Sequence, residues 1–172
     1  MGDIGQGRSA RWQADAISGF TRSELFDRTF QEGMDLVEET ASYLDGVGRQ
    51  DSKLLSRSAA LAYASESMRL TTRLMQVASW LLVQRAVREG EMAPEAALDA
   101  SYRLGSEVRP DAESAVAIDT LPSSVAALIE RSERLFERVR HLDMRMYVVG
   151  AEAQPPHSVL SQMERLKDAF GD

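Results

Sequence analysis

The residue types that most often carry enzyme chemistry are scarce in this chain. It has no cysteine and two histidines, His141 and His157, which excludes thiolate nucleophiles, disulfides and zinc–thiolate sites. Glu137 and His141 are four residues apart and could place two metal ligands on one helix face, but a surface pair is the simpler interpretation. Glu38 and Glu39 are likewise typical of a solvated helix face. We therefore expect no catalytic, cofactor or metal site, and no enzyme activity.

Arginine side chains could instead recognise a partner, and arginine far outnumbers lysine in this sequence. Guanidinium groups suit protein interfaces because their planar donors match carboxylates. Two predicted helices carry arginines at helical spacing, with glutamates interleaved in the second. Such faces either dock an acidic partner or form solvent-exposed salt bridges within the chain. The candidate protein-binding residues on these faces are Arg69, Arg73, Arg131, Arg134, Arg138 and Arg145.

The C-terminal segment 151–172 holds a third candidate site. After a break at Pro155 and Pro156, apolar residues recur at helical spacing over about three turns. A segment this short is marginal as an isolated helix. It is therefore either a fourth packing helix or a partner-binding segment, and both interpretations stay open. The candidate binding residues in this segment are Met163, Leu166 and Phe170, with Val159 in the same stripe.

The composition indicates that helices position these side chains. Apolar residues make up 44% of the chain and aromatic residues 6%, with 11 glycines and 5 prolines in 172 residues, which is typical of an all-α protein. The net charge of −7 argues against nucleic acid and an anionic membrane surface as partners, since both attract basic faces. A DNA-binding helical transcriptional regulator is the alternative function, and the acidic segment 90–121 does not favour it.

The sequence predicts three regions. Residues 1–20 mix glycine, serine and charged residues without a sustained period, which indicates a flexible N-terminal arm. Residues 21–150 form the predicted helical bundle domain, and 151–172 the flexible or partner-binding tail. No secretory leader and no apolar stretch long enough to span a bilayer is apparent, so we expect a cytoplasmic protein.

The first predicted helix begins at Thr21 or Ser23, either of which could cap it, and ends at Gly46. Residues 21–45 hold seven acidic residues and two arginines, a net charge of −5, whereas residues 52–89 hold six basic and two acidic residues, a net charge of +4. Opposite net charges predict a modest attraction between the first helix and the second.

The second predicted helix runs from Asp51 or Ser52 to Glu89, with Gly90 as its cap. A large residue recurs every seven positions and a small residue four positions further on, which predicts a seam for close helix packing. The large residues are Leu54, Leu61, Met68, Met75 and Leu82, and the small ones are Ser58, Ser65, Thr72, Ser79 and Ala86. A second apolar stripe needs cover from another side, and its members are the candidate dimer residues Leu70, Leu74, Val77 and Leu81.

Prolines, glycines and the spacing of apolar residues predict the remaining elements of the bundle. Residues 93–104 predict a short helix, residues 106–120 an acidic connection, and residues 123–149 a last long helix. We therefore expect an all-α fold, an antiparallel three-helix bundle with one short extra helix and flexible termini. The apolar repeat of the last helix comprises Leu128, Leu135, Leu142 and Val149, accompanied by Val125, Ser132, Val139 and Met146.

Two stretches carry a resemblance to a known family. They are VEETASYLDG at residues 37–46 and SKLLSRSAALAYASESMRLTTRLMQVASWLLVQRAV at residues 52–87. The sequence here resembles the alphaproteobacterial regulator of CtrA degradation family. The likeness is dense over residues 37–92 and looser across the last predicted helix, and it assigns no contact residue.

The resemblance implies a dimerising three-helix bundle that serves as an adaptor for the ClpXP protease during the cell cycle. It implies a protease-priming, response-regulator-like factor that prepares ClpX before this protein joins. Substrate transcription regulators, or a cyclic-di-GMP-binding adaptor, would then be delivered. We therefore expect a non-enzymatic, homodimeric adaptor that acts in regulated proteolysis through protein–protein interaction.

Overall fold

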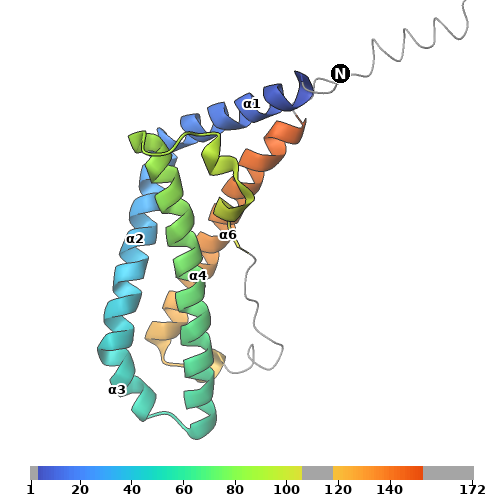
Figure 1. Cartoon of the computed structure of the whole chain (residues 1–172). Helices are drawn as coiled ribbons and strands as arrows, with labels where there is room; N and C mark the ends of the chain where they lie inside the picture. The colour runs from blue at the N-terminus through green and yellow to red at the C-terminus, as the bar shows by residue number, and fades with distance from the viewer. Residues whose placement is uncertain (1–3, 106–117, 153–172) are drawn as a thin grey trace, which may run out of the picture.

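The computed structural model describes residues 4–105 and 118–152, and these residues contain helices and turns with no strand. The prediction of an all-α fold is therefore confirmed. The three longest helices, α2, α4 and α6, contact one another pairwise, and α1 lies across one end of them (Figure 1). The α-helices are α1 Ile4–Thr21, α2 Glu24–Asp45, α3 Val47–Lys53, α4 Arg57–Glu89 and α6 Ser123–Glu152. Short 3₁₀ turns are η1 Ala96–Leu98, η2 Ala100–Tyr102 and η3 Ile118–Thr120.

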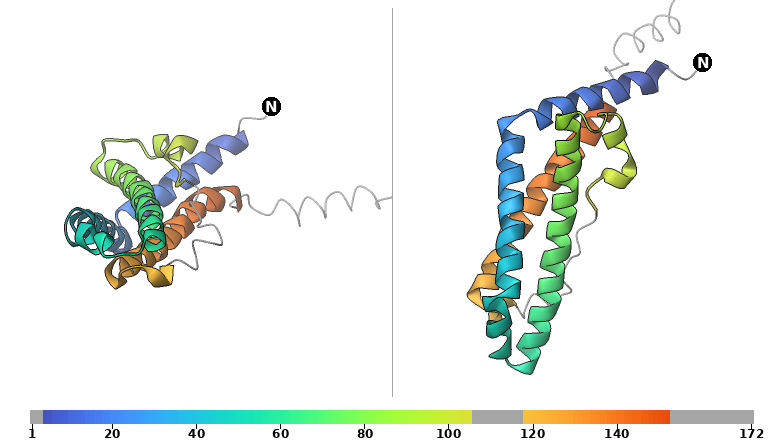
Figure 2. Two further views of the ribbon diagram at one scale, coloured as in Figure 1. Left: turned by 90° about the horizontal axis from the view of Figure 1, so that it is seen from below. Right: turned by 60° about the vertical axis from the view of Figure 1, so that its left-hand side comes forward.

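Helix α2 runs antiparallel to both α4 and α6, whereas α4 and α6 run parallel to each other (Figures 1 and 2). Two contacts show the parallel pairing: the Arg73 guanidinium donates to the Ser132 hydroxyl, and about two to three turns further along both helices the Trp80 indole N–H donates to Asp143. The sequence between Gly90 and the start of α6 is long enough to return along the whole bundle. Consecutive long helices can therefore be parallel here, which a short loop would forbid.

The core lies between the three long helices. Helix α6 buries the apolar repeat predicted from its sequence, including Leu128, Leu135 and Val139. Helix α4 faces it with Trp80 and with the second apolar stripe of that helix. This stripe, the predicted dimer surface, lies inside the chain rather than on its exterior, and its side chains are not available to a second copy. Its members are Leu70, Leu74, Val77 and Leu81.

The structure differs from the prediction of a flexible arm at residues 1–20, because α1 extends from Ile4 to Thr21. Ile17 and Thr21 are almost completely buried, and α1 contacts both α4 and α6. The ring of Phe20 packs edge-on against Phe26, with centroids 5.5 Å apart. The sequence of α1 does not predict a helix because it lacks a strong apolar period. The contacts that stabilise this helix come from elements far away in the chain.

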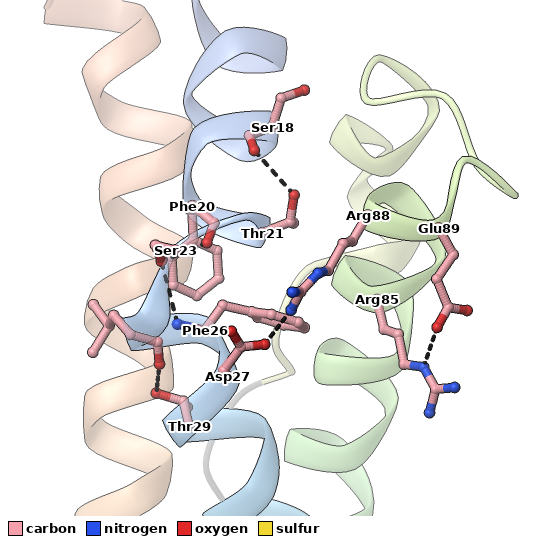
Figure 3. Close-up of polar contacts among 11 residues, drawn as sticks. Ser18, Phe20, Thr21, Ser23, Phe26, Asp27, Thr29, Arg85, Arg88 and Glu89 are labelled. Atoms are coloured by element: carbon pink, nitrogen blue, oxygen red, sulfur yellow. Dashed lines mark hydrogen bonds and ion pairs between the residues drawn. The ribbon is translucent and has the colours of Figure 1, made fainter.

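The corner between α1 and α2 is fixed by caps (Figure 3). The backbone N–H of Phe26 donates to the Ser23 hydroxyl at 3.2 Å, so Ser23 is the N-cap of α2. The Thr21 hydroxyl donates to the carbonyl of Ser18 at 3.2 Å, which closes the last turn of α1. Arg88 of α4 pairs with Asp27 in the first turn of α2. A local cap and a long-range ion pair thus hold the same corner.

Two predicted helices are divided in the structure. The segment predicted to start the second long helix forms α3, and α4 itself begins only after Ser56, whose hydroxyl accepts from the N–H of Ala59. Gly90 ends α4 with φ of 77°, as its predicted cap role requires. The predicted short helix at 93–104 is instead the pair of 3₁₀ turns η1 and η2. We call residues 91–105 the strap, because they fold back over the end of α4.

Candidate functional site

The outward face of α4 is the candidate site. Four large apolar side chains, which we call the α4 stripe, recur every seventh residue along it and are between 50% and 73% exposed. Leu54, which precedes the helix at the same spacing, is 87% exposed. The seven-residue seam predicted for helix packing therefore faces solvent within this chain. The α4 stripe comprises Leu61, Met68, Met75 and Leu82.

This face carries no charge over about seven turns. Each exposed residue between positions 58 and 84 is Ser, Thr, Ala, Leu or Met, although charged residues make up 27% of the chain. The small residues of the seam lie exposed between the large ones at Ser58, Ser65, Thr72 and Ser79. A surface without charge, on which large apolar side chains alternate with small ones, is typical of the centre of a protein interface rather than of a solvated helix.

The charged residues of this part of α4 point inward instead. Arg73 is 4% exposed and donates from its guanidinium to the Ser132 hydroxyl at 2.8 Å, with the Glu133 carboxylate at 3.4 Å. Arg69 donates to the buried carboxylate of Glu66. Arg69 and Arg73 thus serve contacts within the chain, and the burial of Arg73 disfavours a docking face there.

Two hollows border the α4 stripe, and Met75 lines both. One, of about 290 Å³, lies between α2 and α4. The other, of about 460 Å³, lies between α4 and the strap, and we call it the strap groove. The face of α4 is thus a ridge with a cavity on each side, a shape that can interdigitate with another helix. The strap groove is lined by Thr72, Met75, Gln76, Ser79, Trp80, Val83 and Ser101–Arg103 with Gly105.

A buried carboxylate holds the strap in place. Asp143 of α6 is 3% exposed and accepts from the indole N–H of Trp80 at 2.9 Å. It also accepts from the guanidinium of Arg103 at 3.2 Å and the backbone N–H of Leu104 at 3.4 Å. One side chain therefore fastens α4, α6 and the strap together, and it fixes the outer wall of the strap groove.

The arginine face of α6 is a set of salt bridges within the chain. Arg131 donates to Glu39 at 2.7 Å, and Arg138 donates to Glu32 at 2.7 Å, both across to α2. Arg134 pairs with Glu130 on its own helix, and Arg145 is exposed. Exposed pairs of this kind contribute about 0–1 kcal/mol each. The structure thus favours the second of the two interpretations for Arg131, Arg134 and Arg138.

No group of three or more potential metal ligands occurs within the parts of the chain that the structure describes. Among the tyrosines, burial and the carboxylate of Asp51 raise the pKa of Tyr43 far above its usual value, because the phenol donates to that carboxylate at 3.0 Å. This contact closes the turn between α2 and α3 and plays a structural part. Within the described ranges, no helix has the length and apolarity that crossing a membrane requires.

The predicted tail residues Met163, Leu166 and Phe170 lie outside the described residues. The site that the structure reveals, the α4 stripe, was predicted as a seam for close helix packing. The local sequence held no signal that it faces solvent. On a helical wheel, Glu66 and Arg73 fall on the side opposite the stripe, which is where charges lie when an apolar stripe faces a core.

The fold and site define a helical protein with an apolar helix face that none of its described residues covers. Residues 17–170 match a family described as protein of unknown function DUF1465, and the chain belongs to this family, which is the RcdA family. The family expectation drawn from the sequence is confirmed.

One solved structure is similar to this chain in both sequence and fold. RcdA from Caulobacter crescentus CB15 is 67% identical to this chain, and the match covers 74% of this chain and 94% of RcdA with a TM-score of 0.61. A search of curated proteins found no match.

Proposed function

We propose that this protein is a non-enzymatic adaptor in regulated proteolysis of cell-cycle regulators. Its likeness to RcdA supports a role in regulated proteolysis. The charge-free, apolar outer face of α4 is the observation that carries the binding part of the proposal. A surface of this kind suits recognition of another protein and offers no group for a reaction.

The proposed partners are those that the family resemblance implies. ClpX, prepared by a response-regulator-like factor, would bind one part of the protein, and a substrate transcription regulator or a cyclic-di-GMP-binding adaptor would bind another. Tethering of this kind raises the local concentration of the substrate near the protease, so that two modest affinities are sufficient. No nucleic acid or membrane partner is proposed.

We also propose that the protein is a homodimer that pairs through the α4 stripe. The alternation of large and small residues every seven positions is self-complementary when two copies of α4 run antiparallel. With residue 70 on the two-fold axis, Met68 lies beside Thr72 of the partner subunit and Met75 beside Ser65 of the partner subunit. A parallel, in-register pair would instead place large residues against large ones.

A charge placed in the stripe tests this dimer. Met68→Glu should weaken self-association at least tenfold, since it buries an unpaired carboxylate at the proposed interface. Sedimentation velocity over a range of concentrations measures the effect. Met144→Glu on α6 is the matched control, because Met144 is also an exposed methionine and lies outside the stripe. Equal self-association of the two variants would contradict the α4 interface.

A reconstituted degradation assay tests the adaptor function. Purified ClpXP, its priming factor and a candidate substrate are combined with and without this protein, and the initial rate of substrate loss is measured. We expect the protein to accelerate degradation at least severalfold. Comparison of the degradation rates with Met68→Glu and Met144→Glu shows whether the α4 stripe contributes. An unchanged rate for a panel of candidate substrates, with primed protease in excess, would contradict the adaptor proposal.

A further inference from the structure

The strap groove has an apolar floor that no residue of the described ranges fills. Its base is formed by Trp80 and Val83 of α4, and its rim by Met75 of α4 and Tyr102 of the strap. Trp80 is buried and bonded to Asp143, and Val83 packs on the core, so the floor is rigid. Met75 and Tyr102 are exposed at the rim. An apolar floor with exposed rim side chains fits an amphipathic segment better than it fits a small polar ligand.

We propose that the C-terminal segment 158–170 of this same chain docks as an amphipathic helix in the strap groove. Its sequence places apolar residues at intervals of four, three and four, which is the spacing of helix-in-groove recognition. Thirteen residues are too few for a stable isolated helix, so this segment needs a surface to fold against. The family match extends to residue 170, so the segment belongs to the shared part of the family sequence. The docking residues are Val159, Met163, Leu166 and Phe170.

The length of chain beyond α6 permits this docking. Asp143 touches the strap at Arg103 and Leu104, and α6 continues nine residues further to Glu152, about 14 Å along the helix. Residues 153–158 can span up to about 20 Å when extended, and they include the break at Pro155 and Pro156. The chain can therefore turn back and bring residue 159 to the level of the strap. Because the segment is tethered, its effective concentration at the groove is about millimolar, and a weak contact is enough.

The strap groove overlaps the face proposed for self-association. Thr72, Met75 and Ser79 belong to the groove and also to the face proposed to pair with a second copy. A docked tail would cover that half of the face, so tail docking and self-association compete. This consequence rests on the proposed homodimer, whereas the docking itself does not.

Disulfide trapping in the full chain tests the docking, because the natural chain has no cysteine. Ser79→Cys places a thiol in the groove, and Lys167→Cys places one on the tail without removing any of its four apolar residues. Ser65→Cys with Lys167→Cys is the matched control, since Ser65 is exposed on the same face of α4 about 21 Å away. The intramolecular disulfide of each double variant is quantified by non-reducing electrophoresis after mild oxidation at low protein concentration.

We expect at least fivefold more intramolecular disulfide for the Ser79 pair than for the Ser65 pair. Adding Leu166→Glu and Phe170→Glu to the Ser79 pair should remove that preference, because the docking depends on apolar contact. Equal yields from the two pairs, or a preference that survives the two glutamates, would overturn the proposal. A disulfide formed mainly between chains at every dilution would also overturn it, and would assign the groove to the tail of a second copy. None of these outcomes depends on protease delivery.

Discussion

At the scale of single residues, the polar groups that matter most are buried and join distant segments. Asp143 accepts from Trp80, Arg103 and Leu104 at once, and Arg73 bonds Ser132 across the α4–α6 contact. Such groups are costly to bury and costlier to leave without partners. They therefore specify one arrangement of α4, α6 and the strap. Nothing in their local sequence marks them, since an aspartate or arginine on a predicted helix is expected to face solvent.

Removal of the Asp143 carboxylate should loosen the strap. Asp143→Ala leaves the buried indole N–H of Trp80 without an acceptor, and we expect a loss of about 1–3 kcal/mol in the free energy of unfolding, measured with urea. Trp80 emission should shift to longer wavelength as water reaches the indole. Asp45→Ala, which removes an exposed pair with Arg49, should change stability by less than about 1 kcal/mol. Equal effects of the two substitutions would show that Asp143 is not a structural hub.

At the scale of elements, helices with similar patterns serve different purposes. The seven-residue repeat of α6 is buried in the core, whereas the equally regular repeat of α4 faces outward. The acidic α2 packs against the basic α4, as expected, and Asp27 pairs there with Arg88. Its glutamates Glu32 and Glu39 pair instead with α6. The net charge of a helix therefore did not decide which helix its individual charges pair with; their positions around the helix did.

The contact between α2 and α4 depends on a glycine. A Cβ at Gly33 would lie 2.6 Å from a methyl of Leu81, which is completely buried. Gly33→Ala should therefore gain about 1 kcal/mol from helix propensity and lose about 1–3 kcal/mol through overpacking strain. Gly19→Ala is the control, because Gly19 is also helical and has open space around its Cβ position.

Thermal or urea unfolding should place Gly19→Ala at or above the stability of the natural chain and Gly33→Ala below Gly19→Ala by about 1–3 kcal/mol. A Gly33→Ala variant as stable as Gly19→Ala would mean that α2 and α4 are further apart than in this structure.

At the scale of the whole molecule, the connection between α4 and α6 sets the topology. Because the chain returns along the bundle before α6 begins, α4 and α6 are parallel, and the end of α6 lies beside the strap at the end of α4. The described end of α6, from which the C-terminal segment continues, therefore lies at the same end of the bundle as the strap groove. The same arrangement leaves the outer face of α4 without a neighbouring helix among the described residues.

A distance measurement checks this topology. Spin labels at Glu89→Cys and Ser124→Cys, both exposed, should be about 40 Å apart, since they lie at opposite ends of a parallel pair. In an up-down-up bundle with α4 antiparallel to α6, the two sites would share one end, and the distance would be below about 25 Å. Double electron–electron resonance separates these values. The short distance would contradict the parallel arrangement, and with it the placement of the tail.

The sequence by itself determined the helical class, the ends of α2 and α4 at Gly46 and Gly90, the buried face of α6 and the family. Each of these depends on local signals, namely helix period, capping residues and a contiguous block of matching sequence. The tertiary structure alone decided that α1 is a packed helix, that Leu70 and Leu81 are core, and that Met68 and Met75 are exposed. The physical reason is that periodicity shows which residues share a helix face, whereas the cover of that face comes from segments far away in the chain.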